Sequence, residues 1–450
     1  MNFWRSEKIG WRSAMAIVIA NMVGTGVFTT LGLQLEVVQN AWSILFLWLG
    51  GAVISLLGAF SYAEVGTHMP RSGGEYHFLS STIHPMVGYL SGWVSMTVGF
   101  AAPIALAAMA MGAYLENVLP FSANLIALFA ILLISLMHSF SLKRSSRFQD
   151  VLTIVKVLVL LLLVVAGFWH QEPAGRLDWS SQWQQDILLP GYAVALIFVT
   201  YAYSGWNAAA YIVGEIKEPG RNLPIALIGG TLLVSVLYVL LQLALLRLAP
   251  ASMMAGRVEV GQIAARFMFG EQAGRWVSML ISFLLISSIS AMIWVGPRIT
   301  RAMSVDYDLW RFLKKDNAQG IPVRAIWFQS GISVLLILTG SFEEVLLYSG
   351  FVLQLFTAIT VGSIFVLRRK EKPAEAYRSP GFPFLQILYI GISCWIIVFM
   401  VADKPYASLI GVANLGIGLL TYRWSGRRHR LSPKKEPENT SHALEGVGDR

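Results

Sequence analysis

The stretch Met22-Val23-Gly24-Thr25-Gly26-Val27-Phe28 places two glycines inside an apolar segment, the uncharged run 13–35. A run of this length is long enough for a helix to cross a bilayer. Glycine is poor in a helix interior and permits the backbone to unwind. Unwinding frees carbonyl groups at the end of one half-helix and amide N–H groups at the start of the next. The stretch therefore predicts a discontinuous membrane-spanning helix, or, as the alternative, close helix packing through small residues.

A second stretch, Tyr201-Ala202-Tyr203-Ser204-Gly205-Trp206-Asn207, interrupts the uncharged run 187–214 in the other half of the chain. Paired interruptions in two halves of a membrane protein point to a substrate site where the halves meet. The N-terminal end of a half-helix suits a carboxylate, and free carbonyls suit an ammonium. An α-amino acid carries both groups on one carbon. The alternative is a packed aromatic cluster in which Asn207 bonds across helices.

The composition is that of a membrane protein. Of the 450 residues, 56% are hydrophobic and 13% are charged, whereas an average soluble domain has about 25% charged residues. The run after Ser13 has basic flanks but is too long for a cleaved signal peptide, so we expect an uncleaved first helix. Twelve apolar segments, each long enough or nearly so to span, lie near residues 11–35, 42–67, 86–115, 122–140, 148–169, 188–213, 223–249, 274–297, 324–340, 343–367, 381–401 and 405–423.

The basic residues are distributed unevenly between the connecting segments. Most of the 34 lysines and arginines fall in segments that are cytoplasmic if the N-terminus is inside, with clusters in 143–147, 368–372 and 423–435. This asymmetry predicts that both termini are cytoplasmic, in a plasma or bacterial inner membrane. The formal net charge of +9 then reflects loops facing anionic lipid. No interleaving of basic and aromatic residues indicates a nucleic-acid partner.

Several chemistries are disfavoured. The single cysteine, Cys394, lies in an apolar segment, so no intrachain disulfide can form, and no metal-ligand or haem spacing exists. No paired aspartates, Ser–His set or HExxH lies in the spans, so we expect neither an enzyme nor a cofactor. The charged residues 426–450, with two prolines, predict a disordered cytoplasmic tail.

Five stretches, found in order between about residues 10 and 425, resemble one known family. Residues 201–227, YAYSGWNAAAYIVGEIKEPGRNLPIAL, look like the sixth-helix signature of the L-type amino acid transporters, and VGTGVF (23–28) resembles their GSGIF motif. The other three are YAEVGTHMP with SGGEY (62–76), PRITRAM (297–303), and LRR through YR and Pro383 (367–383). By these motifs the chain is similar to the bacterial-type members of the L-type amino acid transporter (LAT) family, in the amino acid–polyamine–organocation (APC) superfamily.

The resemblance implies an all-α integral membrane fold with twelve transmembrane helices. It is the LeuT-like inverted repeat of five plus five helices, with helices 1 and 6 discontinuous and two C-terminal helices appended. In this chain the repeats would be about 11–169 and 188–367, and the appended helices about 381–423. We expect a single transporter domain, 1–425.

The resemblance also implies a substrate site at the two breaks. Backbone N–H groups around Gly24 would hold the substrate carboxylate, namely those of Thr25, Gly26 and Val27. Its ammonium would be bound by the carbonyl groups of Met22, Tyr201, Ala202 and Ser204. Tyr201 matches the aromatic residue that closes over the substrate and is the expected gate. The family more often has Phe at this position and Ser in place of Thr25, so both are small departures.

Lys156 is the one charged residue deep within a span, where a lysine costs about 2.5–3.5 kcal/mol on the insertion scale. It either snorkels to the cytoplasmic face or has a function. The resemblance places it at the fifth-helix lysine of sodium-independent members, where the ammonium takes the place of a sodium ion. It would bond to first-helix carbonyls and to Ser288. Glu64 is expected to be a structural partner for a basic loop or, as the alternative, a proton carrier.

These features predict a secondary active transporter of neutral L-amino acids that works by alternating access, independently of sodium, as an exchanger. The central parts of the spans that form the site lack acidic residues, so a cationic side chain would be costly to bury. A proton-coupled symporter, a transporter of a related amine, and a substrate-gated channel or receptor on the same fold stay open. The expected partners are the amino acid and membrane lipid. Residues 116–122 lack the cysteine that heavy-subunit-linked members carry there, so no disulfide-linked subunit is expected.

Overall fold

The computed structural model describes residues 8–140, 145–169, 178–317, 320–370 and 376–425. Within these ranges the chain is helical and contains no β-strand; one isolated bridge joins Ile9 to Ile216. The expected disordered tail, 426–450, lies outside the described residues. The expectation of an all-α fold is therefore confirmed for the part of the chain that is described.

Each of the twelve expected apolar segments coincides with one helix or with several consecutive ones. These are α1 (Trp11–Met22), α2 (Gly26–Val37), α3 (Ala41–His68), α5 (Pro85–Val94), the π-helical η1 (Ser95–Gly99), α6 (Ala101–Glu116), α7 (Ala123–Phe140), α8 (Ser145–Trp169), α10 (Pro190–Ala202), α11 (Ala208–Tyr211), α12 (Pro219–Leu248), α15 (Glu271–Asp306), α16 (Val323–Thr339), α17 (Phe342–Lys370), α18 (Phe384–Asp403) and α19 (Pro405–Trp424). Short helices occupy connections: α4 (Glu75–Thr82), α9 (Trp183–Asp186), η2 (Val213–Glu215), α13 (Ala251–Met254), α14 (Val260–Phe269) and η3 (Asp308–Lys314).

Length and composition separate these helices into two groups. Among the described residues, nine are long and apolar enough to cross a membrane, when α1 is counted with α2 and α5 with α6. Three more are apolar but shorter, at 153–169, 190–202 and 323–339. The shortest of these, 190–202, ends at the second predicted break. The count of twelve spans stays a prediction.

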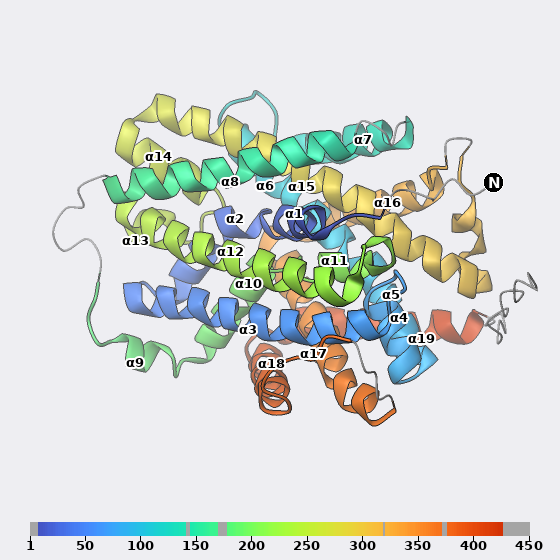
Figure 1. Cartoon of the computed structure of the whole chain (residues 1–450). Helices are drawn as coiled ribbons and strands as arrows, with labels where there is room; N and C mark the ends of the chain where they lie inside the picture. The colour runs from blue at the N-terminus through green and yellow to red at the C-terminus, as the bar shows by residue number, and fades with distance from the viewer. Residues whose placement is uncertain (1–7, 141–144, 170–177, 318–319, 371–375, 426–450) are drawn as a thin grey trace, which may run out of the picture.

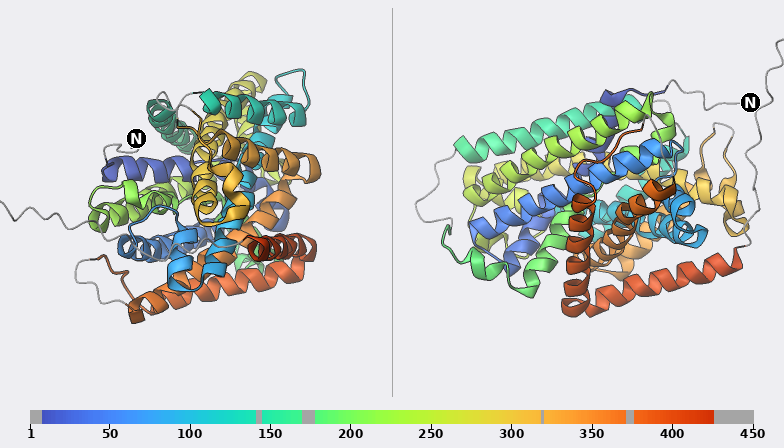
Figure 2. Two further views of the ribbon diagram at one scale, coloured as in Figure 1. Left: turned by 90° about the vertical axis from the view of Figure 1, so that its right-hand side faces the viewer. Right: turned by 60° about the horizontal axis from the view of Figure 1, so that its bottom comes forward.

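The interrupted helices lie inside the bundle. Figure 1 shows α1 near its centre, with α7 and α8 along the upper edge and α17 and α18 along the lower edge. The right-hand view of Figure 2 shows α3, α12 and α8 running side by side, in agreement with the direct packing of α12 on α3 and α8. Because α12 also packs on α1, the first break is enclosed by continuous helices.

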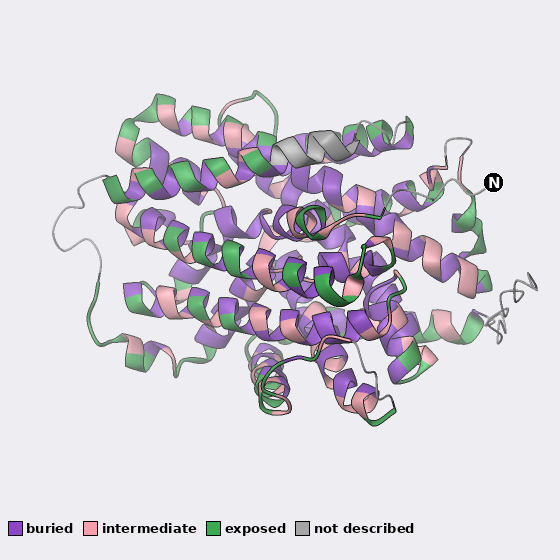
Figure 3. Cartoon of the chain, viewed as in Figure 1, coloured by how far each residue is buried: buried purple, intermediate pink, exposed green. Residues whose placement is uncertain are grey.

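The outer surface is rich in large apolar side chains. Figure 3 shows exposed stripes along the outward faces of helices whose inward faces are buried. The residues in these stripes include Phe129, Met137 and Phe140 on α7, Leu158 and Leu162 on α8, and Val398 and Leu409 on α18 and α19. A soluble monomer rarely exposes large contiguous apolar patches. These faces are suited to contact with lipid.

Candidate functional site

The two helix breaks are packed against each other. A Cβ added at Gly26 would overlap the Cα of Ala202 and lie 2.7 Å from the Cβ of Ala202. In the opposite direction, a Cβ at Gly205 would lie 2.7 Å from the carbonyl carbon of Asn21. Gly205 also has a φ of +96°, a left-handed backbone conformation that favours glycine. At each break, therefore, a glycine without a side chain allows the backbone of the other break to pack closely against it.

At the first break the backbone leaves the helix after Met22. Val23 has a ψ of 79°, and the amide of Gly24 donates to the Met22 carbonyl at 2.7 Å, which closes a tight turn. The hydroxyl of Tyr238 on α12 donates to the same carbonyl at 2.6 Å. The α2 helix then begins at Gly26.

Beyond that turn, three amides are left without partners. The N–H groups of Thr25, Gly26 and Val27 have no hydrogen-bond acceptor among the described residues. All three residues are buried, and most buried backbone donors in proteins are paired. An unpaired, buried helix N-terminus is a suitable binding site for an anionic group.

At the second break, α10 ends at Ala202, and the amide of Ser204 donates to the carbonyl of Tyr201 at 2.8 Å. The carbonyls of Ala202 and Ser204 accept no hydrogen bond from the described part of the chain. The chain resumes as the one-turn helix α11 after Asn207. Free acceptors of α10 thus lie next to free donors of α2, because Gly26 touches Ala202.

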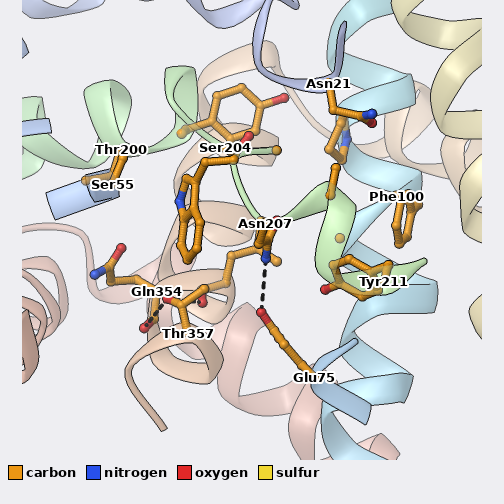
Figure 4. Close-up of a pocket in the computed structure, with 18 of the residues that line it drawn as sticks. Asn21, Ser55, Glu75, Phe100, Thr200, Ser204, Asn207, Tyr211, Gln354 and Thr357 are labelled. Carbon is orange, nitrogen blue, oxygen red and sulfur yellow. Dashed lines mark hydrogen bonds between the residues drawn. The ribbon is translucent and has the colours of Figure 1, made fainter. Parts of the chain in front are cut away.

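A pocket opens beside the breaks (Figure 4). Its lining comes from helices of both halves of the chain and is mainly apolar, aromatic and neutral-polar. The lining residues that Figure 4 labels are Asn21, Ser55, Glu75, Phe100, Thr200, Ser204, Asn207, Tyr211, Gln354 and Thr357. No lysine, arginine or aspartate lines it within the described ranges. Of the described residues that line it, Glu75 alone is acidic.

Glu75 begins α4 and is almost fully buried, with 3% of its surface exposed. Its Oε1 accepts from the hydroxyl of Tyr62 at 2.5 Å and from Nδ2 of Asn207 at 3.3 Å. Its Oε2 accepts from Oγ of Ser91 at 3.4 Å. Burial raises the pKa of Glu75 from 4.5 to about 7, although its three hydrogen bonds act in the opposite direction.

Lys156 is 1% exposed and does not reach the surface. Its Nζ donates to Oγ of Ser288 on α15 at 2.9 Å. A Cβ at Gly24 would lie 3.9 Å from the same Oγ. Ser288 thus lies between Lys156 and the first break, and the expected bonds from the ammonium to first-helix carbonyls stay a prediction.

Comparisons with known proteins decide the family. The family model described as "Amino acid permease" matches residues 9–414. The chain belongs to this family. It is 27% identical over 424 residues to the serine/threonine exchanger SteT of Bacillus subtilis (strain 168), and the aligned region covers 91% of this chain and 96% of SteT. It is 24% identical over 429 residues to the b(0,+)-type amino acid transporter 1 of Mus musculus, covering 92% and 87%. It is 26% identical over 442 residues to the large neutral amino acids transporter small subunit 2 of Rattus norvegicus, covering 92% and 80%.

The expected membership of the APC superfamily is thus confirmed, as is the expectation of an amino acid transporter rather than an enzyme. The residues expected to bind substrate are brought together at the breaks of this permease, but they do not all line the pocket. Tyr201 and Ser204 do, while the first break contributes Asn21. The residues that lie beside the pocket without being part of its lining are Met22, Gly24, Thr25, Gly26, Val27 and Ala202.

Sequence reasoning missed several pocket residues. Gln354 and Thr357 come from α17 and Tyr389 from α18, and nothing in their local sequence indicates a site. Glu75 lies in the SGGEY motif, in a connection between two expected spans, where an acidic residue does not by itself indicate a substrate site. The presence of an acid beside glycines in a motif of this family was the one signal that could have found it.

Glu64 has the structural role that the sequence left open. Arg368 on α17 donates to its two oxygens at 2.7 and 2.8 Å, and the amide of Ser379 donates to it at 2.8 Å. This bidentate pair ties α3 to the end of α17 and the connection that follows it. The charge of Glu64 is therefore balanced by Arg368.

A second hollow lies behind the pocket. It is lined by residues including Ser72, Arg298 and Arg301, which the sequence places on the cytoplasmic side, and it shares Tyr211 and Val295 with the pocket. The ring of Tyr211 meets that of Phe100 edge to face, with centroids 5.9 Å apart. Tyr211 and Val295 therefore border both the pocket and the hollow.

Proposed function

We propose that this permease is a secondary active carrier of neutral L-amino acids that works by alternating access, as an exchanger and independently of sodium. The observation that carries the proposal is the contact between the two breaks. It brings the unpaired amides of Thr25, Gly26 and Val27 next to the unpaired carbonyls of Ala202 and Ser204. Free backbone donors and acceptors at two adjoining helix breaks match the carboxylate and ammonium of one α-carbon.

The pocket supports a neutral side chain. Its walls offer aromatic rings, aliphatic groups and neutral amides and hydroxyls. Both oxygens of Glu75 already accept hydrogen bonds. A substrate carboxylate on the side chain would meet no cation there, and an unpaired buried charge is costly.

The position of Lys156 supports independence from sodium. Its ammonium lies beside Gly24 and donates to Ser288. A fixed cation at this point would supply the positive charge that a bound sodium ion would otherwise bring.

The architecture that goes with this function has twelve spans in one domain, 1–425. We assign the two repeats to residues 11–169 and 188–367 and the appended helices to 381–423, because the breaks fall early in each repeat. The basic segments favour cytoplasmic termini in a plasma or bacterial inner membrane. The one cysteine, Cys394, lies on α18, so we expect no disulfide-linked subunit.

Exchange is favoured over one-way uptake by the name of one relative, the serine/threonine exchanger. The test is counterflow into proteoliposomes, in which vesicles preloaded with a mixture of neutral amino acids are compared with empty vesicles. We expect labelled neutral amino acid to accumulate transiently in the preloaded vesicles only. Non-saturable flux that is equal in both sets would indicate a channel and would contradict the proposal.

The same assay tests the site. A methyl ester removes the carboxylate charge that the amides of α2 would bind, so esters and plain amines should compete poorly with labelled substrate. Gly26→Val should abolish counterflow while the protein still inserts in the membrane. The matched control is Gly331→Val on α16, where an added Cβ meets nothing within 4 Å. Equal competition by esters and free amino acids would show that substrate binds elsewhere.

A further inference from the structure

Glu75 is a buried acid without a cationic partner. Within the described ranges it forms no salt bridge, whereas the equally buried Glu64 is held in a bidentate pair by Arg368. It also lies at the pocket wall, where Figure 4 shows it pointing toward Asn207. An uncompensated carboxylate in a closed site is costly, and protonation is the usual relief.

The groups around Glu75 do not supply the missing charge. Among the described residues, those that approach it are neutral: Tyr62 of α3, Ser91 of α5, Asn207 at the second break, Tyr211 of α11 and Tyr389 of α18. On α4 itself, Tyr76 donates to Asp306, and burial near Arg71 lowers the pKa of His77 to about 4. On α17, which packs on α4, Arg368 is bound to Glu64 and Lys370 donates to the Thr82 carbonyl.

The geometry leaves one oxygen open to a proton. Oε1 accepts hydrogen bonds from the phenol of Tyr62 and the side-chain NH₂ of Asn207. An NH₂ group only donates, so it could not accept a hydrogen bond from a proton on Oε1. Oε2 has only the longer contact to Ser91, whose hydroxyl can turn from donor to acceptor. Protonated and ionised forms of Glu75 are therefore both accommodated, with the proton on Oε2.

Burial brings the titration of Glu75 into the physiological range. Its pKa is raised to about 7, so the carboxyl is mostly protonated below that pH and mostly ionised above it. A substrate that fills the pocket excludes water and removes solvation from the ionised form, which favours the protonated one further.

We propose that Glu75 is a proton-binding site of the transport cycle, which takes up a proton as the pocket closes on substrate and releases it as the pocket opens. This inference rests on the proposed function, because it assigns the proton site to the pocket that binds the amino acid. The bond formed is O–H at Oε2, the bond broken is an O–H bond of hydronium in the solvent, which becomes water, and no electrons are transferred; release reverses this step. Substrate affinity should accordingly rise as the pH falls through neutrality.

The experiment measures the apparent affinity for a neutral amino acid in counterflow, from mildly acidic to mildly alkaline pH, with the same pH on both sides. We expect a several-fold loss of affinity with rising pH in the wild type and a flat profile in Glu75→Gln. The matched control is Asp186→Asn. Asp186 is also a buried acid that accepts a hydrogen bond from a serine, but Asp186 does not line the pocket. This variant should keep the wild-type pH profile.

A second variant protects the test against misfolding of Glu75→Gln. The hydrogen bond from Tyr62 lowers the pKa of Glu75, so Tyr62→Phe should move the midpoint to more alkaline pH. A charge-assisted hydrogen bond of about 1.5–3 kcal/mol corresponds to a shift of about one to two pH units. An unmoved midpoint in Tyr62→Phe, or an unchanged profile in Glu75→Gln, overturns the proposal.

Two other results would also overturn it. If the profile survives in Glu75→Gln and disappears in Lys156→Ala, the titrating group is the lysine. If Glu75→Gln loses only the transport of lysine or ornithine while neutral substrates keep their pH profile, Glu75 is a counter-ion for cationic side chains. Counterflow with a pH-independent affinity refutes this inference alone, whereas no counterflow at any pH refutes the proposed function.

Discussion

Gly26 is the position where one added methyl group should most disturb the substrate site. In Gly26→Ala the new Cβ would overlap the Cα of Ala202 and lie 2.7 Å from its Cβ. Carbon atoms pack favourably at about 3.5–4.0 Å, so the two breaks must separate by about 1 Å. The atoms in the way belong to backbone and to a Cβ, which have no rotamer that moves them aside.

Overpacking of this kind costs about 1–3 kcal/mol. Because the separation acts on the contact that aligns the donors of α2 with the acceptors of α10, we assign this cost to substrate binding. It corresponds to an affinity about 5- to 150-fold weaker, since about 1.4 kcal/mol is a factor of ten. The assay is concentration-dependent counterflow with purified Gly26→Ala in proteoliposomes, together with its thermal unfolding midpoint.

Two alanine variants serve as controls. At Gly24 a Cβ would have no neighbour nearer than 3.8 Å, so Gly24→Ala should keep the thermal stability of the wild type. At Gly331 the space is open, so Gly331→Ala should keep both stability and substrate affinity. Wild-type affinity in Gly26→Ala would refute the reasoning, because the breaks would then not need their contact in order to bind.

Three further predictions concern the gate, the lysine and the structural ion pair. Tyr201 lines the pocket, and we expect its ring rather than its hydroxyl to close the pocket. Uptake should therefore fall severely in Tyr201→Ala and mildly in Tyr201→Phe. A severe loss in the Phe variant would indicate a hydrogen bond from Tyr201 to substrate. Uptake by the wild type should be equal in choline and sodium buffers, and several-fold stimulation by sodium would contradict sodium independence. Lys156→Ala should slow the return of the carrier between its two faces more than it weakens substrate affinity. Arg368→Leu leaves Glu64 buried without its partner and should lower the free energy of unfolding by about 3–5 kcal/mol. The double variant Arg368→Leu with Glu64→Leu should lose less of this free energy. Thermal or denaturant unfolding in detergent would measure both.

The sequence was most informative where function depends on the backbone. Glycine marks both breaks because only glycine permits the close approach of Gly26 to Ala202 and the positive φ of Gly205. These signals are local, and they were visible without coordinates. The lysine in a span was equally visible, because a buried charge in an apolar run needs an explanation.

The walls of the pocket were not predictable in this way. Gln354, Thr357 and Tyr389 reach the pocket through the packing of α17 and α18 against the breaks, and that packing is a property of the whole bundle. Glu75 was missed for a related reason. It lies in a connection between spans in the sequence, and only the short helix α4 brings it under Asn207.

The bond between Lys156 and Ser288 has a thermodynamic consequence. A sodium ion that binds with substrate on one side and leaves on the other dissipates its own gradient and drives net accumulation. The ammonium of Lys156, held 2.9 Å from Ser288, is covalently attached to the carrier and crosses no membrane as an ion. It therefore contributes charge to the site without contributing any driving force. The direction in which a given amino acid is exchanged is then set by the amino acid concentrations on the two sides of the membrane.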